Sequence, residues 1–113
     1  MNLKMNKSLS TGSTIGILGG GQLGQMLSIA AARLGFKTHI FEPSANPPAS
    51  FVASKFTQAE YDDYEALKKF SSDVDVVTYE FENIPTRALN VVEEQCEIFP
   101  SREALKISQD RLL

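Results

Sequence analysis

Cysteine and long apolar segments are scarce in this chain of 113 residues. The one cysteine, Cys96, cannot form an internal disulfide, and we expect a buried thiol in the reduced state. No apolar run approaches the length of a membrane span, and the first residues hold lysines without an apolar stretch, which argues against a secretory signal. These features indicate a cytoplasmic protein without a membrane partner.

Positive charge is also scarce. Eleven lysines and arginines stand against 14 acidic residues, the net charge is −3, and no basic stripe is evident, so a nucleic-acid partner is not expected. The only histidine, His39, falls inside an expected strand, which favours a packed side chain over a catalytic one. Ordinary hydrophobic (42%) and charged (22%) fractions predict a single globular domain with a modest core.

Glycine is concentrated where a strand gives way to a helix. The segment Thr14–Leu18 is a continuous apolar run, typical of a buried parallel strand. Gly19, Gly20 and Gly21 follow, and the apolar period then becomes that of a helix that ends near Gly35. The expected apolar face of this helix consists of Leu23, Met26, Leu27, Ala30, Ala31 and Leu34.

The glycines at positions 19, 21 and 24 have the G-x-G-x-x-G spacing of many mononucleotide- and dinucleotide-binding folds. Free N–H groups at the helix N-terminus favour an anionic or strongly polar ligand at this turn. The alternative interpretation is structural, with glycines that only permit a tight turn and close helix–sheet packing. We favour the ligand site, because ligands of such folds bind beyond the carboxyl ends of the strands.

The remainder of the chain alternates between strand and helix patterns. Further strands are expected at 37–42, 54–57, 74–78 and 97–99. Asp62 or Asp63 should cap a helix, on which Tyr61 is interpreted as a packing residue. Pro85 should start another helix, and Ser101 should cap a last one. This alternation predicts an α/β, Rossmann-like fold with a mostly parallel sheet flanked by helices.

Two carboxylates follow the strongest central strand. Glu80 and Glu82 are two residues apart, so on an extended segment they share a face, and the pair could hold the vicinal hydroxyls of a ribose. No histidine or further acid stands nearby to support a metal site or acid–base catalysis. The alternative is a solvated acidic loop without a ligand.

A competing interpretation rests on Glu42, at the end of the second strand. It lies about 20 residues after the glycine turn, where a dinucleotide-binding fold places the acid that holds the adenosine ribose. An NAD(P)-binding module of an oxidoreductase is therefore the alternative function. Against it, the prolines between Pro43 and Pro48 would crowd an adenosine site.

Three segments together resemble one known family. They are Ile-Gly-Ile-Leu-Gly-Gly-Gly-Gln-Leu-Gly-Gln-Met-Leu (15–27), Val-Val-Thr-Tyr-Glu-Phe-Glu-Asn-Ile-Pro (76–85), and Phe-Pro-Ser (99–101) leading to Gln-Asp-Arg (109–111). They are similar to the amino-terminal, preATP-grasp domain of the 5-(carboxyamino)imidazole ribonucleotide synthases, which belong to the ATP-grasp superfamily. The resemblance extends in register from about residue 14 to residue 113.

The resemblance implies that the complete protein is a ligase of purine biosynthesis. Such an enzyme uses ATP, Mg²⁺ and bicarbonate to form carboxyphosphate and to carboxylate 5-aminoimidazole ribonucleotide, and is expected to act as a homodimer. The positions that it implies for the ribonucleotide are Gly20, Gly21, Gln22, Leu23, Glu80 and Glu82. Arg111 is implied as a contact to an ATP phosphate, whereas no catalytic or metal-binding residue is expected in this chain.

The same resemblance suggests how the chain is divided. Residues 1–13 are expected to form a flexible leader, 14–100 the preATP-grasp domain, and 101–113 the start of a connection to an ATP-grasp region that this sequence does not contain. We therefore expect no synthase activity from the 113 residues alone.

Overall fold

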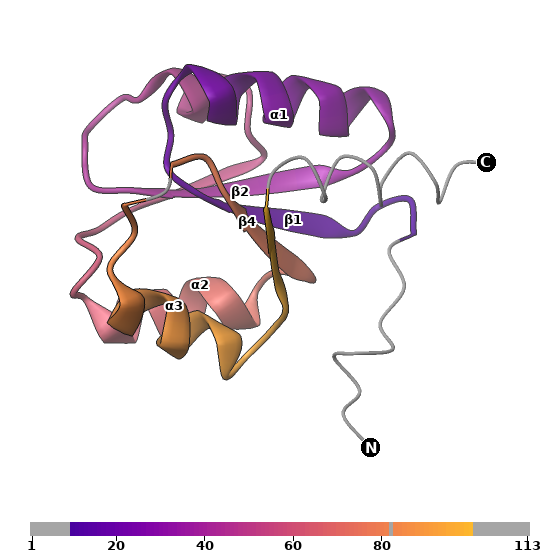
Figure 1. Cartoon of the computed structure of the whole chain (residues 1–113). Helices are drawn as coiled ribbons and strands as arrows, with labels where there is room; N and C mark the ends of the chain where they lie inside the picture. The colour runs from indigo at the N-terminus through magenta and orange to yellow at the C-terminus, as the bar shows by residue number, and fades with distance from the viewer. Residues whose placement is uncertain (1–9, 82, 101–113) are drawn as a thin grey trace.

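The computed structural model describes residues 10–81 and 83–100, which form one parallel sheet between two layers of helices (Figure 1). The strand order is β3-β2-β1-β4-β5, and every neighbouring pair is parallel. The strands are β1 (Thr14–Leu18), β2 (Lys37–Glu42), β3 (Lys55–Gln58), β4 (Val76–Tyr79) and β5 (Ile98–Pro100). The helices are α1 (Gln22–Arg33), η2 (Pro48–Phe51), α2 (Tyr64–Ser72) and α3 (Thr86–Glu93). The expected α/β fold is confirmed.

The sheet is buried on both faces, which explains the continuous apolar runs of its central strands. Helix α1 covers one face, and α2 and α3 cover the other (Figure 1). Ile15 and Ile17 of β1 belong to the core on the α1 side, whereas Leu18 belongs to the core beneath α2 and α3. Gly16 also faces α2, where a Cβ would lie 2.7 Å from the ring of Phe70. Cys96 is buried in this second core, as predicted.

The predicted apolar face of α1 was wrong at its first two positions. Leu23 and Met26 are 41% and 65% exposed. The buried residues of α1 are Gly24, Leu27, Ser28 and Ala31. Small residues let the helix lie close to the sheet, and the Ser28 hydroxyl donates to the Gly24 carbonyl at 2.8 Å, so its burial leaves no unmet hydrogen bond.

Several local predictions are confirmed with small shifts. Asp63, rather than its neighbour, caps α2, because its carboxylate accepts a hydrogen bond from the Ala66 N–H at 3.1 Å. The predicted place of Tyr61 on the helix was wrong, because this residue lies in a turn before α2. Strand β4 begins two residues later than expected. The helix expected after Ser101 lies outside the described residues.

In the part of the chain that the structure describes, no helix combines the length and the apolar character needed to cross a membrane.

Candidate functional site

The candidate site lies at the carboxyl edge of the sheet, between β1 and β4. From β1 the chain runs to β2 and β3 on one side, and then crosses to β4 on the other. Such a switch point leaves a crevice in which ligands of open parallel sheets bind. Gly19 and Glu80 each follow directly after one of these two strands, and the Glu80 N–H donates to the Leu18 carbonyl at 3.1 Å.

The Glu80 carboxylate occupies this crevice. Its Oε1 accepts a hydrogen bond from the Gly21 N–H at 2.8 Å, and its Oε2 accepts one from the Gly24 N–H at 2.6 Å. The N-terminus of α1 thus holds an anion, as its dipole and unpaired N–H groups favour. That anion is a side chain of the protein itself, whereas the sequence led us to expect an external ligand at this position.

The spaced glycines leave room for this carboxylate. A Cβ on Gly21 would lie 2.8 Å from Oε1 of Glu80, and a Cβ on Gly24 would lie 3.0 Å from Oε2. A Cβ on Gly19, whose φ is +109°, would lie 3.0 Å from the carboxyl carbon. All three glycines of the G-x-G-x-x-G pattern therefore face Glu80, and a side chain at any of them would displace it.

A second carboxylate binds the same turn from the other side. Oε1 of Glu42 accepts from the Gly20 N–H at 3.0 Å, and its Oε2 accepts from the N–H and the hydroxyl of Ser44 at 3.0 and 2.5 Å. Pro47 is buried against the turn, since a Cβ on Gly20 would lie 2.9 Å from its ring. Glu42 thus stabilises the turn, and this geometry argues against a hydrogen bond from the ribose of a dinucleotide to Glu42.

Hydrogen-bonding capacity remains on both sides of the crevice. A carboxylate offers about four acceptor positions, and the two N–H groups use only two of those on Glu80. The N–H groups of Gln22 and Leu23, in the first turn of α1, have no acceptor among the described residues. The site therefore presents acceptors for hydroxyl groups beside two backbone donors.

The side chain of Tyr61 approaches the same edge from the α2 face. Its ring packs on those of Phe41 and Phe81, with centroids 5.6 and 5.7 Å away. Its hydroxyl oxygen is buried and has no hydrogen-bond partner in the described part of the chain. Burial, together with the charges of Glu42 and Glu80, raises the pKa of Tyr61 above its usual value, so the phenol stays neutral.

The structure brings together most of the site residues predicted from the sequence. Gly20, Gly21, Gln22, Leu23 and Glu80 all lie at this edge. Glu82 and Arg111 lie outside the described residues.

Sequence reasoning missed how two other residues would lie at this edge. It considered Glu42, at the end of its strand, only in the dinucleotide alternative, and did not predict that its carboxylate would accept a hydrogen bond from the glycine turn. It placed Tyr61 on a helix, and nothing in the local sequence marks a turn residue as a neighbour of this site.

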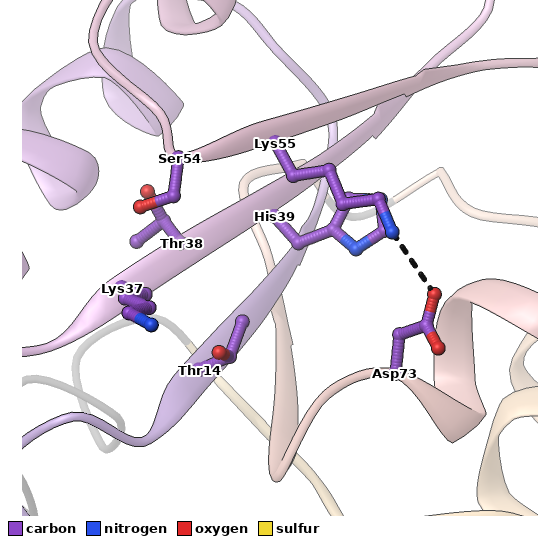
Figure 2. A pocket seen from close by; sticks show the side chains of 7 residues that line it. All are labelled: Thr14, Lys37, Thr38, His39, Ser54, Lys55 and Asp73. Atoms are coloured by element: carbon purple, nitrogen blue, oxygen red, sulfur yellow. Dashed lines mark hydrogen bonds and ion pairs between the residues drawn. The ribbon is translucent and has the colours of Figure 1, made fainter.

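A cavity of about 460 Å³ lies at the opposite, amino edge of the sheet (Figure 2). It is lined by Thr14, Lys37, Thr38, His39, Ser54, Lys55 and Asp73. Lys55 and Asp73 form an ion pair of 3.3 Å, drawn in Figure 2. Burial, reinforced by the Lys55 charge and opposed by Asp73, lowers the pKa of His39 to about 4. His39 is thus a neutral, packed residue, as predicted.

The open parallel sheet, flanked by helices and with the glycine turn at its switch point, defines a Rossmann-like α/β domain. Residues 12–109 match the ribonucleotide synthetase preATP-grasp domain family, and the chain belongs to this family. The resemblance seen in the sequence is thereby confirmed.

Relatives and solved structures agree with this assignment. The chain is 53% identical over 104 residues to N5-carboxyaminoimidazole ribonucleotide synthase of Brucella melitensis. The aligned region covers 92% of this chain and 29% of the relative. The chain is also 53% identical over 105 residues to the bifunctional purine synthesis protein purC/E of Dictyostelium discoideum, covering 93% of this chain and 10% of that protein.

Two solved structures show the same fold. The N5-carboxyaminoimidazole synthetase of Staphylococcus aureus, complexed with ADP, superposes with a TM-score of 0.78 at 42% identity, covering 88% of this chain and 27% of that one. The synthase of Aspergillus clavatus, in complex with ADP and 5-aminoimidazole ribonucleotide, gives a TM-score of 0.70 at 33% identity, with coverage of 85% and 26%. This chain therefore spans less than a third of the relatives that it matches.

Proposed function

We propose that this chain is the substrate-side, amino-terminal part of an ATP-dependent ligase. The complete protein would carboxylate 5-aminoimidazole ribonucleotide with bicarbonate, giving 5-(carboxyamino)imidazole ribonucleotide for purine biosynthesis. Membership of the preATP-grasp family and the names of the relatives support the reaction. The observation that carries the binding role is the half-buried Glu80 carboxylate, held at the switch point of the sheet with acceptor positions to spare.

Glu80 is suited to a pair of neighbouring hydroxyl groups. The N–H groups of Gly21 and Gly24 fix its two oxygens before any ligand arrives. The 2′- and 3′-hydroxyls of a ribose would donate one hydrogen bond to each oxygen, and such charge-assisted bonds are the strong ones. Because the carboxylate is already ordered, little side-chain freedom is lost when the ligand binds.

The other predicted contacts complete this proposal. The N–H groups of Gln22 and Leu23 would donate to an acceptor on the ligand, beside the backbone of Gly20 and Gly21. Glu82 is proposed as a second carboxylate of the ribonucleotide site, on the basis of the sequence resemblance.

The remaining steps are assigned to the rest of the protein. ATP would supply the phosphoryl group that activates bicarbonate, and Arg111 is proposed to contact an ATP phosphate. Among the described residues, no group of three or more His, Cys, Asp or Glu side chains could hold a metal ion, so no step is assigned to Mg²⁺ here. We propose a cytoplasmic homodimer, and we expect this chain by itself to have no synthase activity.

The test is the binding of 5-aminoimidazole ribonucleotide, followed through the amide NMR signals of the ¹⁵N-labelled chain. We expect the signals of Gly21 to Gly24 to shift. Glu80→Gln should weaken binding about tenfold or more, since a lost charged hydrogen bond costs roughly 1.5–3 kcal/mol. Glu94→Gln is the matched control, because Glu94 is exposed at the end of α3, at the far edge of the sheet.

The dinucleotide alternative predicts the opposite pattern. NADH would bind the unmodified chain, and Glu42→Ala would abolish that binding, while 5-aminoimidazole ribonucleotide would leave the spectrum unchanged. That combination of results would refute the proposed function.

A further inference from the structure

The glycine turn has the spacing of a phosphate-binding loop but carries negative charge. In a phosphate-binding loop, the N–H groups before and at the helix N-terminus face the anionic ligand. Here the N–H groups of Gly20, Gly21 and Gly24 each donate to a carboxylate of the same chain. These three glycine donors are therefore already in use, and a phosphoryl group that reached the remaining N–H groups of Gln22 and Leu23 would lie beside the Glu80 carboxylate.

The glycines support the same conclusion. In a dinucleotide-binding fold, the second glycine of the pattern lets the pyrophosphate approach the backbone. The corresponding position here is Gly21, and the space above its Cα is filled by Oε1 of Glu80, 2.8 Å from where a Cβ would lie. The carboxylate and a phosphoryl group would thus compete for one place.

No ion pair between described residues offsets this charge. Among the described residues, the ion pair that involves a lysine or arginine is the one between Lys55 and Asp73, at the amino edge of the sheet. The neighbouring phenol of Tyr61 stays neutral, so it neither adds to the negative charge of the two carboxylates nor offsets it. A phosphoryl group at the turn would therefore meet two carboxylates, Glu42 and Glu80, and neither forms an ion pair with a lysine or arginine in the part of the chain that the structure describes.

We propose that Glu80 is a specificity-determining residue that keeps phosphoryl groups off the glycine turn. A ribonucleotide then presents its ribose hydroxyls to the turn and directs its 5′-phosphate away from it. The orientation rests on the proposed function, which supplies the ribonucleotide, whereas the exclusion of phosphoryl groups does not.

Exclusion is tested by titrating pyrophosphate into the ¹⁵N-labelled chain at constant ionic strength. The unmodified chain should show no saturable shift at the amides of Gly21 and Gly24. Glu80→Ala removes the competing anion and opens its space, so it should bind pyrophosphate at these amides at least about tenfold more tightly. Glu94→Ala, which removes an exposed charge at the far edge, should behave as the unmodified chain does.

The Glu80→Ala variant loses two hydrogen bonds, so its fold is checked by the dispersion of the remaining amide signals. If Glu80→Ala does not fold, Glu80→Gln replaces it, since this variant removes the charge but keeps the shape. A smaller gain in affinity for pyrophosphate is then expected. Pyrophosphate binding at these amides in the unmodified chain would overturn the proposal. A folded variant that still rejects pyrophosphate would overturn it as well.

Orientation is tested by comparing 5-aminoimidazole ribonucleotide with the ribonucleoside that lacks its phosphate. If the ribose faces the turn, both ligands shift the amides of Gly21 and Gly24, although the nucleoside binds more weakly. Loss of those shifts with the nucleoside would place the phosphate at the turn and refute the orientation. If neither ligand binds, the proposed function fails, while the pyrophosphate experiment still decides the exclusion.

Discussion

Acidification should destabilise this fold through His39. This side chain is 2% exposed on β2, with its ring edge-on to Phe70 at 4.8 Å and its Nε2 2.6 Å from the Thr57 hydroxyl oxygen. Burial is the main reason that its pKa falls from 6.5 to about 4, with the Lys55 charge second and Asp73 acting in the opposite direction. The unfolded chain therefore takes up a proton at a higher pH than the folded one.

The sign and size of the effect follow from this difference in pKa. Because the folded pKa of His39 lies below the unfolded one, its contribution is fully present above pH 6.5 and is lost as the pH falls from there through about 4. Each unit of difference corresponds to about 1.4 kcal/mol, so the total loss is about 3 kcal/mol. That is a large share of the roughly 5–15 kcal/mol that stabilises a typical domain.

The assay is urea unfolding at several pH values between 7 and 4, for the unmodified chain and for His39→Gln. The amide of glutamine can still bond to Thr57 but does not titrate, while the carboxylates titrate equally in both proteins. We expect the variant to be less stable at pH 7 and the difference in unfolding free energy to shrink by about 3 kcal/mol at pH 4. Two stability curves that stay parallel over this range would refute the reasoning.

Three further predictions concern stability. Asp63→Ala should cost about 1 kcal/mol in urea unfolding through the lost cap of α2, whereas Asp62→Ala, at an exposed neighbour, should cost little. Gly21→Ala should lower the unfolding free energy by about 1–3 kcal/mol, because the new Cβ displaces Glu80. The Gly21 backbone (φ −78°) suits alanine, so the cost comes from this displacement and should vanish in a Glu80→Ala background. Tyr61→Phe should leave the thermal midpoint unchanged or raise it, because the buried hydroxyl makes no hydrogen bond within the described residues, and a clear fall would show a hidden partner.

The order of strands and helices could be predicted because each pattern is local. Apolar runs located the buried strands, and the cap at Asp63 and the proline at 85 located two helix starts. The buried face of α1 could not be predicted in the same way. A count of apolar residues favours Leu23 and Met26, yet both are exposed, and the buried positions of α1 include Gly24 and Ser28, whose hydroxyl bonds to its own helix.

The site was predicted only in part, for a related reason. The spacing of the glycines indicated an anion at the helix N-terminus, and the position of Glu80 after β4 indicated the same edge of the sheet. Neither pattern shows that the Glu80 carboxylate accepts hydrogen bonds from the N–H groups of the glycine turn, because this contact depends on how β4 lies beside β1. The same holds for Glu42, whose bond to Gly20 needs the turn to fold back over β2.

The contact between Gly21 and Glu80 spans 59 residues, so the turn and its anion come together only when β4 joins β1. Closing a loop of that length is slow compared with forming the first strand and helix. A chain that has emerged only as far as β3 already contains Glu42 but not Glu80, so the N–H groups of Gly21 and Gly24 lack this acceptor at that stage. The selectivity proposed for this turn therefore depends on a long-range contact that can form only after β4 has joined β1.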